Sequence, residues 1–419
     1  MSAFVINGGR RISGTLRVQG SKNSVLPILA ATVLVEGKSV IHNCPDLSDT
    51  AGTVDILKNL GCKVIREGNS IIVDSTTLNN TEIPQTLMRE MRSSVIFLGA
   101  ILGRAKNATV SSPGGCEIGL RPIDLHLYAM KQLGVSVDDS YGKLICTVPK
   151  GLEGNKITFS FPSVGATENA ILAAVTAKGT TTIVNAAREP EIIDLCDFLN
   201  KCGGEILGAG ESVITIRGRE KLVPCEHSVI CDRIACATYL IAGAMTGGDV
   251  NLENTNPVHL NAVLPLLEEA GCNINVRCRE IRLKAPPRLS RMDKIITQPY
   301  PGFPTDAQAP FTSLACVARG TTVIVENIFE SRFKHIPELV RMGARIRSEG
   351  RVAVIDGVER LYGAEVISPD LRGGAALVLA GICAEGVTTV KNTRFIDRGY
   401  EDFENNLCML NADIKRKAD

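Results

Sequence analysis

The chain has 419 residues, of which 44% are hydrophobic, and its 46 basic and 45 acidic side chains leave a formal net charge of +1. The length predicts two or three domains, and no apolar run reaches the ~18 residues that a membrane-spanning helix needs. Balanced charge and a content of only 17 aromatic residues argue against a nucleic-acid or anionic-lipid binder, which would need excess positive charge or stacking surfaces. Nothing near Met1 resembles an export signal, so we expect a soluble cytoplasmic protein with no membrane or nucleic-acid partner.

The chain contains 14 cysteines, a high number for a protein of this kind. No two of them form a C-x-x-C pair, and the five histidines are scattered along the sequence. We therefore expect no structural metal, and we expect most cysteines to be reduced core residues.

The sequence begins with a hairpin-like segment, Phe4–Val18, and then repeats one pattern six times. In each copy a helical apolar pattern ends at a glycine, or once at an asparagine, and a short strand follows. Successive copies are 68 to 73 residues apart, at Gly61, Gly134, Gly203, Gly271, Gly343 and Asn411.

A second helix recurs in each copy and ends at a turn before a strand rich in β-branched residues. The turn positions are Gly37, Asn107, Gly179, Gly248, Gly320 and Gly386. The sixth copy lacks its final strand pair, which the N-terminal segment could supply. We therefore predict an α/β protein with two similar domains of three units each, residues 22–230 and residues 1–21 with 231–419, joined by a double hinge. A solenoid is the alternative, but its units are usually shorter than these.

Polar residues collect where the second helices should begin. Counting 15 residues back from the turn positions gives Lys22, Arg92, Val164, Arg233, Thr305 and Leu371, with Asn23, Ser163, Asp232, Asp306 and Arg372 adjacent to them. Helix N-termini carry partial positive charge, so three of them together at one end of a domain would suit an anion. We expect two such ends to face each other across a cleft. Helix capping is the alternative, and it would explain Ser163, Asp232 and Asp306 but not the basic residues.

The second copy contains a longer loop, from Pro113 to Gly134, which is rich in glycine and proline. It carries Cys116, with Arg121 five residues later. A thiol in an electropositive loop of this kind is a candidate acid, base or nucleophile, and the loop itself could act as a lid.

These motifs resemble those of the UDP-N-acetylglucosamine 1-carboxyvinyltransferase family. The resemblance covers nearly the whole chain and is carried by residues 20–23, 113–126, 303–306, 370–372 and 397–400. It implies a fold of two domains, each with three βαβαββ units around a pseudo-threefold axis. It also implies transfer of the enolpyruvyl group of phosphoenolpyruvate to the 3′-hydroxyl of UDP-N-acetylglucosamine with release of phosphate, the first committed step of peptidoglycan synthesis.

The resemblance also implies roles for individual residues. Cys116 would protonate C3 of phosphoenolpyruvate and Asp306 would accept the proton of the sugar hydroxyl. The groups expected to bind phosphoenolpyruvate are Lys22, Asn23, Arg121, Arg332 and Arg398, and Arg372 would join the same cationic end. The groups expected to hold the UDP-sugar are Arg92, Arg121, Pro122, Ile123, Asp124, Leu125, Ser163, Val164 and Ile328.

The implied reaction requires no cofactor or metal, and the oligomeric state stays open. The epoxide fosfomycin, a mimic of phosphoenolpyruvate, is expected to alkylate Cys116. Phe161-Pro162 and Ser48 depart from the family pattern by removing positive charge, which puts nucleotide affinity in doubt. Two alternative functions are the shikimate-pathway enolpyruvyl transferase, which lacks the cysteine loop, and a UDP-sugar sensor without catalysis.

Overall fold

The computed structural model describes residues 2–90, 92–111, 123–140 and 142–417. These residues form two compact units. We call residues 20–111 with 123–230 the first unit, and residues 2–19 with 231–417 the second unit.

The described part of each unit contains three four-stranded sheets of identical design. In each sheet one edge strand runs parallel to its neighbour, and the other neighbouring strands pair antiparallel. In the first unit the sheets are β14 (Glu226–Ser228), β3 (Lys38–His42), β5 (Ser70–Asp74) and β4 (Lys63–Glu67); β6 (Glu82–Ile83), β7 (Asn107–Ser111), β9 (Lys143–Thr147) and β8 (Ser136–Ser140); and β10 (Lys156–Thr158), β11 (Thr180–Val184), β13 (Val213–Arg217) and β12 (Glu205–Leu207).

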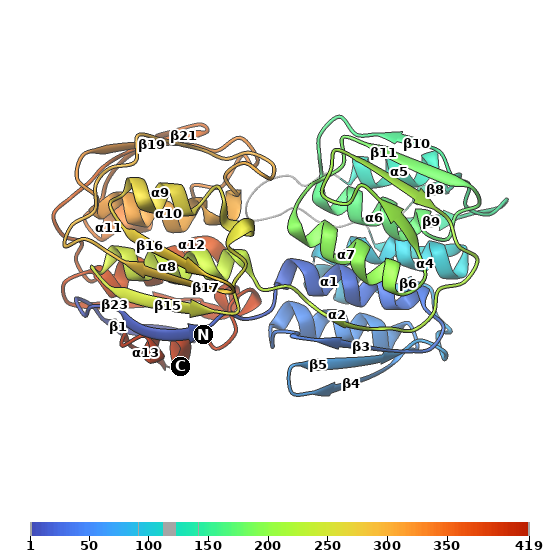
Figure 1. Cartoon of the computed structure of the whole chain (residues 1–419), viewed down its shortest axis with the longest axis horizontal. Coiled ribbons are helices and arrows are strands. Elements are labelled where there is room, and N and C mark those ends of the chain that lie inside the picture. The colour runs from blue at the N-terminus through green and yellow to red at the C-terminus, as the bar shows by residue number, and fades with distance from the viewer. Residues whose placement is uncertain (1, 91, 112–122, 141, 418–419) are drawn as a thin grey trace. The chain divides into compact units, whose positions relative to one another are not determined.

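The second unit repeats this design, and the chain's first residues take part in it (Figure 1). Its sheets are β2 (Ser13–Arg17), β15 (Asp249–Glu253), β17 (Glu280–Lys284) and β16 (Asn273–Arg277); β18 (Lys294–Ile296), β19 (Thr321–Val325), β21 (Val352–Asp356) and β20 (Arg345–Glu349); and β22 (Glu365–Ile367), β23 (Val387–Lys391), β1 (Ala3–Asn7) and β24 (Asp413–Lys417).

The N-terminal segment does not form the expected hairpin, because β1 and β2 lie in different sheets. β1 lies between β23 and β24, so that Ile6 is opposite both Thr388 and Ile414. β2 instead runs parallel to β15. Each of these two sheets lacks one strand without the N-terminal segment, and pairing β1 with β2 would leave both incomplete.

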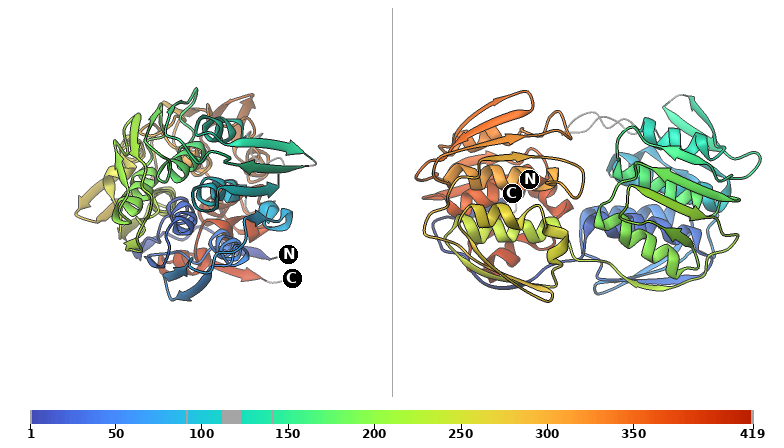
Figure 2. Two further views of the ribbon diagram at one scale, coloured as in Figure 1. Left: turned by 90° about the vertical axis from the view of Figure 1, so that its right-hand side faces the viewer. Right: turned by 45° about the horizontal axis from the view of Figure 1, so that its top comes forward.

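One helix of each repeat is almost entirely buried. These inner helices are α1 (Lys22–Ala31), α4 (Phe97–Ala105), α6 (Val164–Ala174), α8 (Arg233–Met245), α10 (Thr305–Val317) and α12 (Leu371–Cys383). They are apolar on every side, which is why neighbouring helices and sheets surround them. Figure 2 shows the sheets of each unit on the outside and the helices between them.

The other helices are shorter or have an exposed side. The second helices of the repeats are α2 (Ser48–Asn59), α5 (Asp124–Gln132), α7 (Pro190–Lys201), α9 (Leu264–Glu269), α11 (Ile336–Arg341) and α13 (Phe403–Met409). The remaining helical segments are α3 (Gln85–Glu90) and the 3-10 turns η1 (Thr32–Leu34), η2 (Arg92–Ile96), η3 (Pro257–Leu260) and η4 (Thr393–Arg398). No helix in the described ranges is long and apolar enough to cross a membrane.

The predicted helix ends occur where the sequence pattern placed them. The six residues from Gly61 to Asn411 that close the second helices all have φ between 74° and 96°. Only glycine adopts this region without strain, and asparagine tolerates it better than most residues. The turns before the strands differ at two places: Lys106 (φ 65°) rather than Asn107, and Gly247 rather than Gly248, take the left-handed conformation.

Candidate active site

The inner helices begin at the residues that the spacing predicted. α1 begins at Lys22, α6 at Val164, α8 at Arg233, α10 at Thr305 and α12 at Leu371. Arg92 begins η2, which leads directly into α4. The polar residues singled out in the sequence therefore do lie at helix N-termini in both units.

In the first unit, the start of α1 carries a buried ion pair. Lys22 Nζ lies 2.7 Å from Asp49 Oδ2, and the two side chains are only 11% and 4% exposed. Asp49 belongs to the first turn of α2. It holds the ammonium group at the end of the inner helix, and the sequence analysis did not identify it. Asn23, the next residue, is half-buried.

The start of α6 combines a helix cap with a buried histidine. The Ser163 hydroxyl accepts a hydrogen bond from the Ala166 amide at 3.4 Å. His126 lies beside this turn, since a Cβ on Gly165 would come within 3.0 Å of its ring. Asn169 Nδ2 donates to His126 Nδ1 at 2.7 Å, which leaves the proton of the neutral ring on Nε2. Burial lowers the pKa of His126 to about 4, while Asp124 raises it.

Other residues expected to bind the UDP-sugar are only partly described. Ile123 and Leu125 are half-buried at the start of α5, and Asp124 is exposed there. Val164 is half-buried as the first residue of α6. Cys116, Arg121 and Pro122 lie outside the described residues, and so does the side chain of Arg92.

In the second unit, Asp306 lies between two arginines. Its Oδ1 atom is 2.6 Å from Arg332 Nη2 and its Oδ2 atom is 3.3 Å from Arg372 Nη2. Both arginine side chains are 3% exposed, whereas that of Asp306 is 28% exposed. Two buried cations thus flank one accessible carboxylate.

A buried carboxylate next to this group organises the backbone around it. Glu326 Oε1 accepts hydrogen bonds from Thr297 Oγ1 at 2.9 Å and from the Ile328 amide at 2.8 Å. Its Oε2 atom accepts one from Thr305 Oγ1 at 2.9 Å. Glu326 therefore ties the start of α10, just before Asp306, to the loop that carries Ile328, which is half-buried. Glu326 was not predicted from the sequence, because a single glutamate after a strand matches no motif.

Arg372 is fixed by its own helix and by an aromatic ring. Asp370 caps α12 by accepting hydrogen bonds from the amides of Arg372 (3.0 Å) and Gly373 (2.9 Å). The Arg372 guanidinium lies 5.2 Å from the centroid of the Tyr400 ring. Tyr400 in turn hydrogen-bonds Thr238 of α8 at 2.9 Å, so α8 and α12 meet at this point.

Arg398, the last residue of η4, is half-buried. Its neighbour Asp397 is held by Arg416 of β24 through two contacts of 2.9 and 2.7 Å. Arg416 also lies 4.7 Å from the ring centroid of Phe4 in β1. The C-terminal strand therefore fixes the turn that carries Arg398.

The capping alternative is correct for two of the three residues to which it applied. Asp232 accepts hydrogen bonds from the Ile234 and Ala235 amides at 2.9 and 2.8 Å, and Ser163 caps α6. Asp306 makes no cap, because Pro304 occupies the capping position of α10. Its side chain contacts Arg332 and Arg372 instead.

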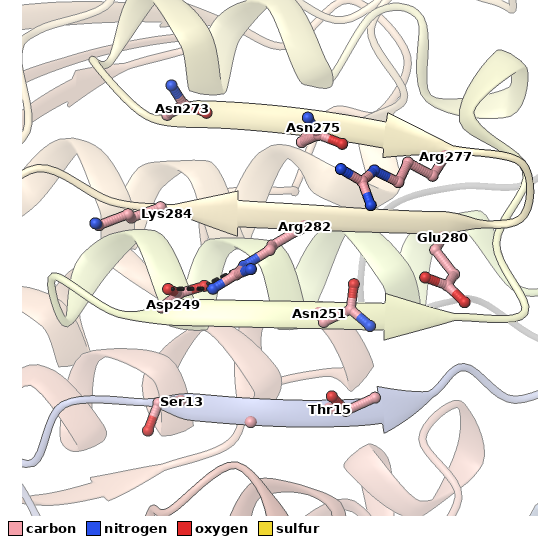
Figure 3. A pocket seen from close by; sticks show the side chains of 11 residues that line it. Ser13, Thr15, Asp249, Asn251, Asn273, Asn275, Arg277, Glu280, Arg282 and Lys284 are labelled. Carbon is pink, nitrogen blue, oxygen red and sulfur yellow. Dashed lines mark hydrogen bonds and ion pairs between the residues drawn. The ribbon is translucent and has the colours of Figure 1, made fainter.

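A separate polar hollow lies on the outer face of the sheet formed by β2, β15, β17 and β16 (Figure 3). Its best-defined contact is a paired hydrogen bond from Arg282 to Asp249, with both distances at 2.9 Å. It shares no residue with the predicted site. β15, β17 and β16 pair antiparallel, an arrangement that commonly leaves one face of a sheet polar and exposed to solvent, and the hollow lies on such a face.

The sequence is similar to those of known enzymes over its full length. The sequence model of the EPSP synthase (3-phosphoshikimate 1-carboxyvinyltransferase) family matches residues 6–407. The chain is 50% identical over 418 residues to UDP-N-acetylglucosamine 1-carboxyvinyltransferase 2 of Caldanaerobacter subterraneus subsp. tengcongensis, covering 99% of this chain and 100% of that protein. It is 48% identical to UDP-N-acetylglucosamine 1-carboxyvinyltransferase 1 of Symbiobacterium thermophilum, covering 99% and 95%.

Solved structures agree with the predicted fold. The enolpyruvyl transferase NikO of Streptomyces tendae superposes with a TM-score of 0.89 at 27% identity, covering 99% of this chain and 98% of that one. EPSP synthase of Acinetobacter baumannii shares the fold, with a TM-score of 0.76 at 18% identity and full coverage of both chains. The chain therefore belongs to the EPSP synthase family of enolpyruvyl transferases and, within it, to the UDP-N-acetylglucosamine 1-carboxyvinyltransferases.

Proposed function

We propose that this protein transfers the enolpyruvyl group of phosphoenolpyruvate to the 3′-hydroxyl of UDP-N-acetylglucosamine and releases phosphate, as the first committed step of peptidoglycan synthesis. The observation that carries the proposal is the contact of Asp306 with Arg332 and Arg372. This contact combines a proton acceptor with fixed cations. Addition of an alcohol to an anionic enol phosphate requires both.

Asp306 acts as the base in this proposal. It takes the proton of the sugar hydroxyl while the oxygen bonds to C2 of phosphoenolpyruvate. Cys116 donates a proton to C3 in the same addition. Loss of phosphate from C2 and of a proton from C3 then restores the double bond in the product.

The cationic groups bind the phosphate and carboxylate of phosphoenolpyruvate. Lys22, Arg121, Arg332 and Arg398 take this role, with Asn23 and Arg372 beside them. An anion bound to Arg332 competes with Asp306 for the same guanidinium. The carboxylate is then released toward the sugar hydroxyl, and the reaction is coupled to the presence of phosphoenolpyruvate.

The UDP-sugar is held by residues from several segments. They are Arg92, the stretch 121–125, Ser163, Val164 and Ile328. The exposed Phe161 (42%) and the exposed Ser48 offer no positive charge to the diphosphate, so we expect the remaining cations to carry this contact.

A phosphate-release assay tests the proposed function. Purified protein is incubated with phosphoenolpyruvate and either UDP-N-acetylglucosamine or shikimate 3-phosphate. Phosphate release that depends on UDP-N-acetylglucosamine supports the proposal. Release with shikimate 3-phosphate but not with UDP-N-acetylglucosamine identifies the other branch of the family. Binding of the UDP-sugar without any phosphate release identifies a sensor.

A further inference from the structure

Two cysteines of the first unit, neither of them assigned to the reaction, lie in contact. The Cys202 and Cys225 sulfur atoms are 3.3 Å apart, and both residues are unbridged. Cys202 directly follows α7, and Cys225 directly precedes β14. A backbone hydrogen bond of 2.8 Å from the Val223 amide to the Cys202 carbonyl joins the same two segments.

The two thiols have different surroundings. Cys202 is fully buried, whereas Cys225 is half-buried and therefore accessible to a small reagent. Lys201 is adjacent to Cys202 in the sequence, and its Nζ atom lies 3.1 Å from His227 Nδ1, two residues past Cys225. The hydrogen bond from Cys202, followed by the charge of Lys201, lowers the pKa of Cys225 despite its partial burial. The same hydrogen bond and burial raise the pKa of Cys202.

We propose that Cys202 and Cys225 form an oxidative modification site at which hydrogen peroxide converts the two thiols into a disulfide. Cys225 is the reacting thiol and Cys202 the resolving one, since the thiolate is the nucleophile in such reactions. The sulfur atoms need to approach by only about 1.3 Å to reach the S–S bond length of about 2.05 Å.

The reaction balances with peroxide as the oxidant. The Cys225 thiolate attacks one peroxide oxygen, the O–O bond breaks, and a sulfenic acid and one water form once a proton is taken up. The Cys202 thiol then attacks the Cys225 sulfur, and the sulfenic oxygen leaves as a second water with the thiol proton. In total, two thiols and one peroxide give one disulfide and two waters.

The bond would join the end of α7 to the last strand of the first unit. His227 of β14 already hydrogen-bonds Asp194 of α7 at 2.9 Å, and Asp194 also accepts from the Ile230 amide at 3.2 Å. Oxidation would add a covalent link to these contacts, so we expect reductant-sensitive stabilisation of the segment that leads out of the first unit at Ile230.

Peptide mapping of the whole protein tests this site. The protein is treated with hydrogen peroxide, its remaining thiols are alkylated, and it is cleaved after lysine, arginine and glutamate. Glu226 separates Cys225 from Cys231, and Lys201 separates Cys202 from Cys196, so the expected linked peptides are 202–205 and 222–226. We expect this pair to form before the exposed Cys278 is modified, and to disappear on reduction.

Two variants test the assigned roles. In Cys202→Ser we expect a Cys225 sulfenic acid that dimedone traps, and in Cys225→Ser we expect Cys202 to stay reduced. Circular dichroism verifies that both variants fold, and the corresponding alanine variants replace any that do not. Dimedone trapping at Cys202 instead would overturn the assigned order of the two thiols. The site itself would be overturned if Cys278 oxidises in the wild-type protein while the 202–225 disulfide does not form.

Discussion

Lys22 Nζ lies 2.7 Å from Asp49 Oδ2, and both side chains are nearly inaccessible to solvent. The ammonium group that we assign to phosphoenolpyruvate is thus placed by a carboxylate on the neighbouring helix. Breaking a buried ion pair leaves one charge without its partner, which typically costs roughly 3–5 kcal/mol.

Asp49→Asn should therefore lower both stability and turnover. We expect a clear drop in the thermal midpoint and a loss of at least about tenfold in kcat/KM for phosphoenolpyruvate, because the lysine loses the group that orients it. Asp55→Asn, at an exposed position of the same helix, is the matched control and should leave both values near wild type. Equal behaviour of the two variants would show that Asp49 does not position Lys22.

Asp306→Asn should separate binding from chemistry. The amide keeps the shape of the side chain but cannot take up the hydroxyl proton. We expect kcat to fall by about 10²-fold or more, while the affinity for UDP-N-acetylglucosamine, measured by calorimetry, changes little. Asp293→Asn, on an exposed residue of the same unit, serves as the control. A near-normal kcat in Asp306→Asn would remove the base role.

Cys116 is expected to be the thiol that fosfomycin alkylates. Intact-mass analysis followed by peptide mapping should show one adduct per chain, on the peptide containing Cys116. Cys116→Ser should give no adduct and should lose nearly all turnover while still binding the UDP-sugar. An adduct on another cysteine, or full activity in the serine variant, would contradict the assignment.

Arg416 is predicted to position Arg398 through Asp397. Its guanidinium makes two contacts with Asp397 and further contacts with Glu404, a pattern that lysine cannot reproduce. We expect Arg416→Lys to raise the KM for phosphoenolpyruvate by roughly tenfold, with a smaller effect on kcat. Lys415→Gln in the same strand is the control. A KM unchanged in Arg416→Lys would show that the turn holds Arg398 without this strand.

The stability of the protein should fall in mild acid, in part because of His126. Burial lowers its pKa to about 4 in the folded state, compared with 6.5 when it is free. As the pH falls, the unfolded chain therefore binds this proton before the folded chain does. The contribution of neutral His126 to the free energy of unfolding is complete above pH 6.5 and is lost as the pH falls toward about 4. Linkage gives a total loss of about 3 kcal/mol in this free energy.

His126→Asn tests this contribution, since its side-chain oxygen can still accept the hydrogen bond from Asn169. Chemical denaturation at pH 7 and at pH 4.5 should show a smaller acid loss in the variant than in the wild type. The same loss in both proteins would mean that His126 is protonated without cost in the folded state.

The repeat spacing was sufficient to predict much of the fold. Counting 15 residues back from the turn positions placed the starts of α1, α6, α8, α10 and α12 at their observed residues. The hairpin expected for residues 4–18 was wrong, because strand pairing depends on which sheets lack a strand, and local sequence does not show this.

The candidate site was predictable only in part. Basic residues at apolar helix starts stand out, which is how Lys22 and Arg372 were identified. Asp49, which pairs with Lys22, and Tyr400, which lies against Arg372, come from other elements, and so does Glu326, which binds Thr305 and the Ile328 amide. These contacts depend on distances that only the folded chain defines. The Cys202–Cys225 contact was missed for the same reason, since 23 positions separate the two residues.

The chemical structure of the reaction product tests the proposed activity. Phosphoenolpyruvate and UDP-N-acetylglucosamine are incubated with the protein, and the nucleotide-sugar fraction is analysed by mass spectrometry and NMR. We predict an enol ether at the 3′-oxygen of the sugar, formed in equal amount to the phosphate released. Recovery of a UDP-sugar that carries no enolpyruvyl group, from protein in which Asp306 and Cys116 are intact, would show that the protein does not catalyse this transfer.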